Sequence, residues 1–330
     1  MRLLKKTLKN PRLWLGIIIL SIFLYKINID ATALYTADKT LLAAAILALI
    51  IQTIIRAYRW SYITRIFTKK NTLIHSAKIY YIGQLLNETA PQGTGDITKA
   101  YLSHKSYKTK SKSILMPITE RISDISALAL GSILILYTLP LNLSKYYLNI
   151  AIVIAVLTII YTTSLKPKYL EKILNTALRI LTKGKKNIKK GELHWRDLNK
   201  KNMLIIATLT TSCWLIEAIA HKQLIHSLGY TITYPQILAI VCFSWLASIP
   251  AFLPGGIGVR EIIYAYLLTL TGIPLATGSL IAVTYRAIIW LKFGTLGFLS
   301  YITYKNIDLQ DTNLNNINRA IKASKKQKTK

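Results

Sequence analysis

Long apolar stretches, separated by short basic or turn-rich segments, follow one another through most of the chain. A helix that crosses a bilayer needs about 20 predominantly apolar residues, and six continuous stretches approach or exceed that length. The pattern therefore predicts an all-α polytopic membrane protein. We expect transmembrane helices at residues 13–29, 40–67, 113–139, 146–165, 202–228 and 275–304.

Two further apolar segments, residues 72–103 and 235–271, are interrupted by proline and glycine, in "PQGTG" and "PGGIG". Lysines stand on both sides of the first segment, at Lys69 and Lys105, and a full crossing would place one of them outside. We therefore expect each segment to be a re-entrant hairpin, the first from the cytoplasm and the second from outside. Non-helical backbone is tolerated at membrane depth where protein or a wet cavity surrounds it. The expected total is eight apolar segments.

The two interrupted segments resemble each other in register. An "AYL" triplet follows each glycine-rich break, and the distance from its alanine to the next membrane arginine, Arg121 or Arg286, is 21 residues in both. Three full spans separate the hairpins, so the two halves are predicted to be inverted. We place the first half at residues 12–139 and the second at 146–304 of a single membrane domain, residues 1–330. Inverted repeats with broken helices that meet near the midplane are typical of transporters.

The charge distribution predicts how the chain lies in the membrane. The formal net charge is +30, and the basic residues cluster between apolar segments, most of all in residues 166–201 and in the tail, residues 305–330. The positive-inside rule explains this clustering, and we expect no nucleic acid partner. The prediction is a multi-pass protein of the cell membrane with both termini cytoplasmic. "ATA" at residues 31–33 imitates a signal-peptide cleavage site, but we expect the first apolar run to stay as a signal anchor.

Six of the thirteen acidic residues lie in or beside the apolar segments, together with seven basic residues. A charge at bilayer depth costs about 2.5–3.5 kcal/mol or more, so each is a candidate for function. The alternative is structural: the charges pair and hold the hairpins, Glu261 with Arg286 and either Glu88 or Asp96 with Arg121, while Arg260, Lys99 and Lys292 snorkel to the interface. The set comprises Glu88, Asp96, Glu120, Asp124, Glu217 and Glu261 with Arg56, Arg59, Lys99, Arg121, Arg260, Arg286 and Lys292.

The breaks themselves favour binding of an anion. A helix that stops inside a membrane leaves backbone N–H groups unpaired, glycine lets the backbone approach a ligand, and arginine forks match phosphate oxygens. The other interpretation is that glycine only permits close helix packing. We predict that a lipid phosphate is held by Arg121, Arg286, Arg260, Gly93, Gly95, Gly256 and Gly258, and that Asp96, Glu120, Glu261 and Glu88 orient these groups or accept protons.

Other chemistries have little support. The sequence contains no GxxxxGK[ST] or GxSxG motif, and His221 and His226 are badly spaced for a shared metal. Cys213 and Cys242 lie inside apolar runs and are expected to pack as small hydrophobic residues. We expect no enzyme activity, no metal and no other cofactor.

"LPGGIGVRE" followed by "GIPLATGSLIAVTYRAIIW" resembles the lysylphosphatidylglycerol synthase transmembrane-region family, also called flippase-like domain proteins, as does "PQGTGDITKAYLSHK" with the later "SILMPITERISDI". The resemblance implies a membrane domain of six to eight spans. In bifunctional members that domain is joined to an aminoacyl transferase domain, and its role is to flip the aminoacylated lipid. No transferase sequence occurs here, so aminoacylation is not implied. "NETAPQGTGD" departs from the usual Leu-Pro and double glycine, which counts against a phosphatidylglycerol-type substrate.

Three functions remain open. The first is a translocase for an anionic phospholipid or a polyprenyl-linked lipid headgroup, with membrane lipids as partners. The second is an accessory protein for a glycosyltransferase or lipid-synthesis enzyme, docked through residues 166–201. The third is an ion-coupled transporter of a small anion.

Overall fold

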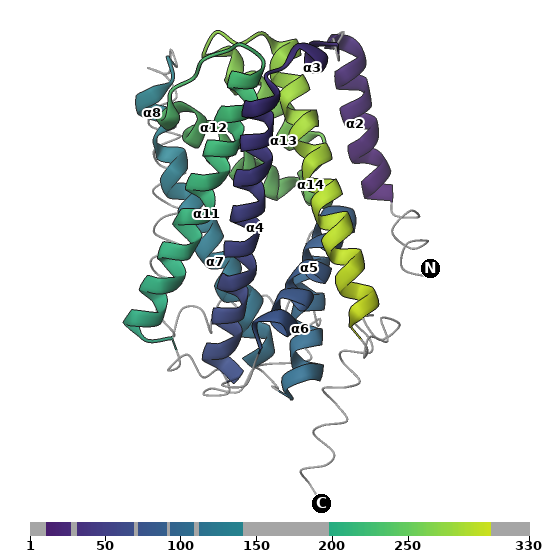
Figure 1. Cartoon of the computed structure of the whole chain (residues 1–330), viewed down its shortest axis with the longest axis vertical. Helices are drawn as coiled ribbons and strands as arrows, with labels where there is room; N and C mark the ends of the chain where they lie inside the picture. Colours follow the sequence, from purple (N-terminus) through teal and green to yellow (C-terminus); the bar gives the residue numbers. More distant parts are fainter. Residues whose placement is uncertain are drawn as a thin grey trace, which may run out of the picture.

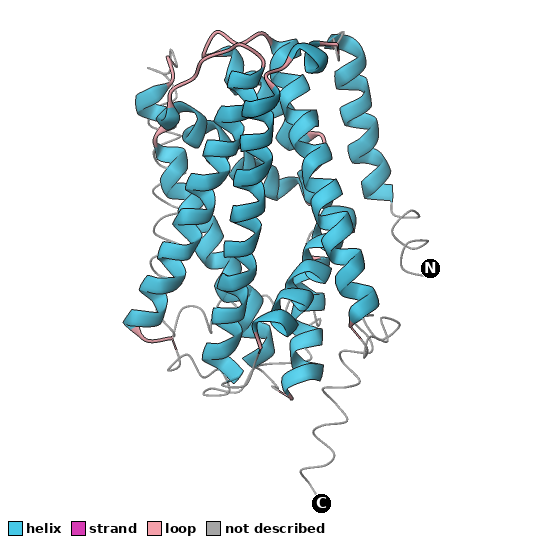
Figure 2. Cartoon of the chain, in the orientation of Figure 1, coloured by secondary structure: helices cyan, strands magenta, loops and turns pink. Residues whose placement is uncertain are grey.

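The computed structural model describes residues 11–27, 32–68, 72–90, 93–108, 112–140 and 198–304. All regular elements in these ranges are helices (Figure 2). Five helical stretches in the described part are long and apolar enough to cross a membrane, which agrees with the predicted all-α polytopic fold. They are Lys39–Thr68, Lys112–Thr138, Lys200–Ser227, Tyr234–Ala251 and Leu275–Thr303.

Each predicted span that falls in the described ranges corresponds to a helix. Helix α2 (Pro11–Ile27) corresponds to the first span, but its apolar part, Trp14–Ile27, is shorter than the other spans. Tyr234–Ala251 has the length and composition of a span, although the sequence assigns it to a hairpin. The predicted span at 146–165, most of the basic segment 166–201 and the tail at 305–330 lie outside the described residues.

Two long antiparallel helices form the centre of the bundle. Helix α4 (Lys39–Thr68) packs along α11 (Lys200–Ser227), and the two run in opposite directions in Figure 1. The short helix α3 (Ala33–Thr36) precedes α4. Helix α7 (Lys112–Ile133) lies beside this central pair and contacts both of its helices. It continues into the short helix α8 (Ile135–Thr138).

The first interrupted segment is a helical hairpin. Helix α5 (Leu73–Thr89) begins at the N-cap Thr72, whose side chain accepts from the backbone of His75, and α6 (Thr94–Tyr107) returns beside it. Gly93 stands before α6 at φ 85°, a left-handed conformation that glycine adopts at little cost. The break lets the chain reverse inside the bundle.

The second interrupted segment is also a hairpin. Helix α12 (Tyr234–Ser248) is followed by two 3-10 turns, η2 (Ile249–Ala251) and η3 (Pro254–Gly256), and then by α13 (Val259–Thr269). Helix α13 packs against α12 and against α14 (Leu275–Thr303), the last described helix.

The two hairpins enter the bundle from opposite ends, and their tips meet in its middle, where η3 contacts α5 (Figure 1). Each also packs on a helix of the other half, α5 on α14 and α12 on α7. Each hairpin therefore contacts a helix of both predicted halves. The division into two halves and the number of re-entrant segments stay predictions.

Candidate functional site

The tips of the two hairpins are joined through Arg286 on α14, whose side chain is 3% exposed. Its Nη1 donates to Glu88 Oε2 on α5 (3.2 Å) and to the carbonyl oxygen of Gly255 in η3 (2.9 Å). Its Nε donates to Glu261 Oε1 on α13 (2.9 Å). One guanidinium therefore contacts both hairpins, and the pairing of Glu261 with Arg286 considered from the sequence is present.

Arg121 on α7 holds the corresponding position in the first half. Its Nε donates to Asp96 Oδ2 on α6 at 2.6 Å, and each arginine follows its carboxylate by 25 residues. The side chain of Arg121 is 40% exposed, against 3% for Arg286. Within the described part of the chain Asp96 is its only ion-pair partner. Arg121 therefore keeps part of its fork open to a ligand, whereas Arg286 is fully engaged in protein contacts.

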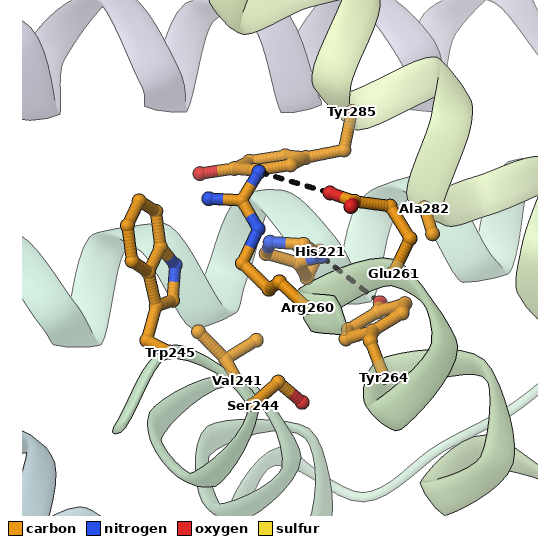
Figure 3. Close-up of a pocket in the computed structure, with 9 residues that line it drawn as sticks. All are labelled: His221, Val241, Ser244, Trp245, Arg260, Glu261, Tyr264, Ala282 and Tyr285. Carbon is orange, nitrogen blue, oxygen red and sulfur yellow. Dashed lines mark hydrogen bonds and ion pairs between the residues drawn. The ribbon is translucent and has the colours of Figure 1, made fainter. Parts of the chain in front are cut away.

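Arg260 lies in the first turn of α13 and is only 4% exposed (Figure 3). Its guanidinium carbon is 4.1 Å from the centre of the Trp245 ring and 5.5 Å from that of Tyr285. Its Nη2 is 3.3 Å from Glu261 Oε1. The interfacial alternative for Arg260 is therefore wrong, because the aromatic rings and the packing of α13 against α14 hold the side chain inside the protein.

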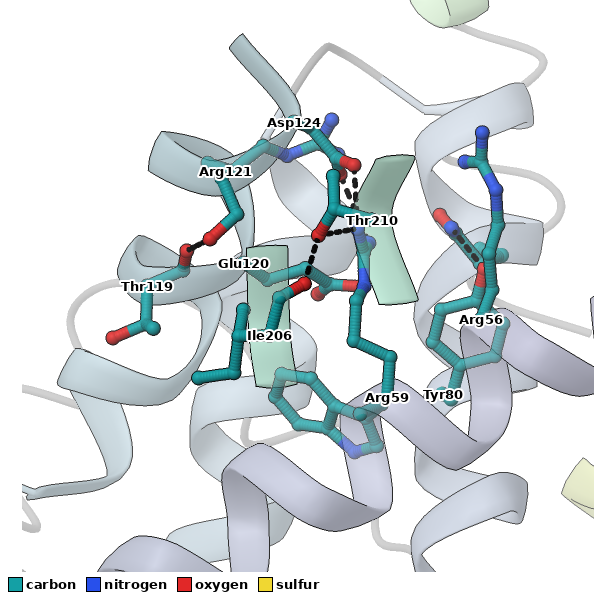
Figure 4. A network of polar contacts seen from close by, with 12 residues as sticks. Arg56, Arg59, Tyr80, Thr119, Glu120, Arg121, Asp124, Ile206 and Thr210 are labelled. Atoms are coloured by element: carbon teal, nitrogen blue, oxygen red, sulfur yellow. Dashed lines mark hydrogen bonds and ion pairs between the residues drawn. The ribbon is translucent and has the colours of Figure 1, made fainter. Parts of the chain in front are cut away.

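A second buried group of charges connects α4 with α7 (Figure 4). Arg59 is 0% exposed and donates to both carboxylate oxygens of Asp124 (2.6 and 3.0 Å), to Glu120 Oε1 (3.1 Å) and to the hydroxyl of Thr210 (2.9 Å). Lys99 on α6 completes the group through Glu120 and is 1% exposed. Lys99 is thus not interfacial either, and this group of charges is largely satisfied.

Glu217 on α11 is the acceptor at the centre of the bundle. It receives Arg56 Nη2 (2.8 Å) and Gln52 Nε2 (2.5 Å) from α4. It also receives the indole N–H of Trp245 (3.1 Å) and the hydroxyl of Tyr285. Four donors from three other helices therefore fix this carboxylate in place.

The charges surround a polar cavity between the hairpin tips, with about 580 Å³ of space including its open side. Cationic, amide and aromatic side chains from both halves line it. The polar and charged lining residues are Gln52, Arg56, Gln84, Asn87, Glu88, Arg121, Glu217, Trp245, Tyr285 and Lys292.

Lys292 gives this cavity an unbalanced positive charge. Each of the other six cations in the group singled out from the sequence has a carboxylate in ion-pair contact. Among the described residues, the one hydrogen-bond acceptor for Lys292 Nζ is the carbonyl oxygen of Leu49, at 3.5 Å, and the centre of the Phe293 ring lies 4.7 Å away. Seven cations face six carboxylates in this group, so its formal charge is +1. The lysine lines the cavity.

Two of the glycine N–H groups that were predicted to bind phosphate already donate hydrogen bonds to side chains of the protein. The N–H of Gly95 donates to Asn87 Oδ1 (3.0 Å), and the N–H of Gly258 donates to Glu261 Oε2 (2.8 Å). A Cβ on Gly95 would lie 1.9 Å from the carbonyl oxygen of Gly83. Gly95 and Gly258 therefore serve helix packing and capping, the alternative considered from the sequence, and of the four glycines none lines the cavity.

Several uncharged site residues were not predicted from the sequence, and the partner of Glu88 differs from the one considered. Glu88 was considered as a partner of Arg121 but pairs with Arg286, which is 198 residues away. Gln52, Gln84, Asn87 and Tyr285 are uncharged, and one uncharged polar residue in an apolar run gives no distinct signal. The spacing of Gln52 and Arg56, four residues apart on one helix face, was the only available hint.

Comparisons with known proteins agree with this description. The family described as "Lysylphosphatidylglycerol synthase TM region" matches residues 12–297. The UPF0104 membrane protein PH1989 of Pyrococcus horikoshii is 25% identical over 303 residues, which is 83% of this chain and 90% of that protein. The match extends over both hairpins and the central cavity.

Proposed function

Because the chain belongs to the family of the lysylphosphatidylglycerol synthase transmembrane region, we propose that it moves the headgroup of an anionic phospholipid or a polyprenyl-linked lipid across the membrane through the central cavity. It performs no covalent chemistry on that lipid. The partners are membrane lipids, and the localisation is the cell membrane.

The observation that carries the proposal is the unbalanced charge of the cavity. Lys292 has no carboxylate partner among the described residues, and Arg121 is half engaged and 40% exposed. A phosphodiester carries one negative charge, which matches the formal +1 of the buried group. Lysine offers a point charge and arginine a fork, the two usual means of binding phosphate.

The polar lining supports a headgroup in this cavity. Gln52, Gln84 and Asn87 offer amide donors and acceptors beside the cations. A headgroup that leaves water at one face of the membrane needs such groups to replace its hydrogen bonds with water. Glu88 and Glu217 are already bound by Arg286 and Arg56, which weakens their repulsion of a phosphate.

The roles of the two arginines consequently differ from the sequence prediction. Arg121 and Lys292 bind the phosphate, and Arg286 holds the hairpins together. Asp96 orients Arg121 through two hydrogen bonds, to Nε (2.6 Å) and to Nη2 (3.3 Å).

The experiment is a flipping assay in sealed vesicles that contain the purified full chain. The probes are fluorescent phosphatidylglycerol and a fluorescent polyprenyl phosphate, and a reductant that cannot cross the membrane destroys the fluorophore in the outer leaflet. Vesicles with and without an imposed proton gradient are compared. We expect Lys292→Met and Arg121→Gln each to slow flipping by about tenfold or more, since a lost charged contact of about 1.4 kcal/mol has that effect.

Lys200→Met is the matched control, because Lys200 is exposed at the start of α11. It should flip lipid at the wild-type rate. The proposal fails if the Lys292 and Arg121 variants fold and flip both probes as the wild type does. Uptake of radiolabelled phosphate into the same vesicles, without lipid flipping, would instead identify a transporter of a small soluble anion.

A further inference from the structure

A second, smaller pocket lies behind the wall of the central cavity. Trp245 and Tyr285 line both spaces, and Arg260, His221 and Glu261 line only the smaller one (Figure 3). The centre of a water-sized sphere can move through about 10 Å³ of this pocket, against about 60 Å³ in the central cavity. That space is about the least that holds one water-sized species, so a lipid headgroup does not fit there and the pocket suits a single small ion.

The pocket contains more hydrogen-bond donors than acceptors. Both terminal nitrogens of Arg260, Nη1 and Nη2, are buried without a hydrogen-bond acceptor in the described part of the chain. The same holds for Nε2 of His221, whose other ring nitrogen is 2.9 Å from the hydroxyl of Tyr264. Both residues are 4% exposed. Buried donors without acceptors cost free energy, and a guanidinium costs more because it is charged.

The nearby acceptors are already in use. Glu261 Oε1 accepts from Arg286, so its 3.3 Å contact with Arg260 is shared between two guanidinium groups. Glu261 Oε2 accepts from the N–H of Gly258. The hydroxyls of Ser244 and Tyr285 donate elsewhere, to Ile240 and to Glu217. The protein itself therefore leaves the charge of Arg260 only partly balanced.

The surrounding groups favour an anion over a neutral molecule. The rings of Trp245 and Tyr285 cover the faces of the guanidinium, so its N–H groups in the plane remain as the contact surface. Arg260 also lies in the first turn of α13, where the helix dipole adds positive potential. One water would satisfy two donors but would leave the charge unchanged.

We propose that this pocket binds one small monovalent anion of halide size, held by Arg260 Nη1 and Nη2 and by His221 Nε2–H. The His221 contact requires that Tyr264 donates its hydroxyl proton to His221 Nδ1, which fixes the tautomer of the ring. The anion balances the excess positive charge of the buried group when no headgroup occupies the central cavity. The site stands on its own geometry and does not depend on lipid transport.

Thermal unfolding of the purified full chain tests the site. The midpoint is measured in sodium chloride, in sodium bromide and in sodium gluconate at equal ionic strength, because gluconate is too large for the pocket. A halide at several times its Kd should raise the midpoint by about 2–4 °C over gluconate. Arg260→Gln should abolish the difference, and Lys200→Met, which removes an exposed charge at the start of α11, should retain it.

A direct readout on the unmodified protein covers the case in which Arg260→Gln does not fold. Crystals grown in bromide should show an anomalous difference peak in contact with the Arg260 guanidinium. Equal midpoints in halide and gluconate overturn the proposal, as does bromide density that lies elsewhere with only water beside Arg260. A halide effect that persists in Arg260→Gln also overturns it, because the anion would then bind at another place.

Discussion

Arg286 on α14 donates to Glu88 at the end of α5, with 3.2 Å between Nη1 and Oε2. The contact ties the tip of the first hairpin to a helix that already holds the second hairpin through Glu261. It has no counterpart in the other half: Glu88 stands three residues before Pro91, whereas Ala251 stands three residues before Pro254. Arg121 is consequently left open to the cavity. The two arginines differ because a glutamate precedes the first break and an alanine stands at the matching position before the second.

Glu88→Gln should loosen the junction of the hairpins. The substitution keeps the size of the side chain but removes the charge that Arg286 Nη1 contacts, so we expect a loss of about 1–3 kcal/mol of stability. Thermal unfolding of Glu88→Gln, Arg286→Gln and the double variant gives the coupling energy. Strictly additive effects would show that the two side chains do not interact in the folded protein.

Arg59→Met should be among the most destabilising substitutions in the chain. It leaves Asp124 without its closest cation and removes one of the two cations that contact Glu120, all in the protein interior. Breaking a buried ion pair from one side costs about 3–5 kcal/mol. Arg65 is exposed on the same helix, so Arg65→Met is the matched control and should cost less than about 0.5 kcal/mol. Equal losses in denaturation experiments would contradict the role given to Arg59.

Gly95 and Gly93 should respond differently to alanine. A Cβ on Gly95 would lie 1.9 Å from the carbonyl oxygen of Gly83, so α5 and α6 would have to separate, at a cost of about 3 kcal/mol. Gly93 has no atom within 4 Å of such a Cβ, and alanine there meets only the strain of φ 85°, about 1 kcal/mol. Unfolding midpoints of the two variants measure the difference. A larger loss for Gly93→Ala would mean that close packing is not what Gly95 provides.

The sequence predicts local features of this site better than its long-range contacts. Proline and glycine mark both hairpin breaks because they alter the backbone directly, and the common spacing to Arg121 and Arg286 follows from the repeated register. The partner of Glu88 cannot be read in this way, since Arg286 lies 198 residues away on a helix of the other half. Burial likewise depends on packing: Lys99 and Arg260 look interfacial in sequence but are enclosed by neighbouring helices.

Cysteine accessibility should establish how the hairpins lie in the membrane. Cys213 and Cys242 are free and buried, so a variant with alanine at both positions gives a clean background. Single cysteines are then placed at the ends of the hairpins that lie away from their tips. They are Lys105→Cys for the first hairpin, and Thr231→Cys and Pro274→Cys for the second. All three positions are exposed. A maleimide that cannot cross membranes is applied to intact cells and to inverted vesicles.

The predicted topology requires Lys105→Cys to react only from the cytoplasmic face, because the basic segments around the first hairpin lie inside. Thr231→Cys and Pro274→Cys should both react from the outer face, since a hairpin that enters and returns leaves its two ends on one side. Labelling of these two positions from opposite faces would mean that residues 235–271 cross the membrane. In that case α14 would also run the other way, and the inverted arrangement of the two halves would be wrong.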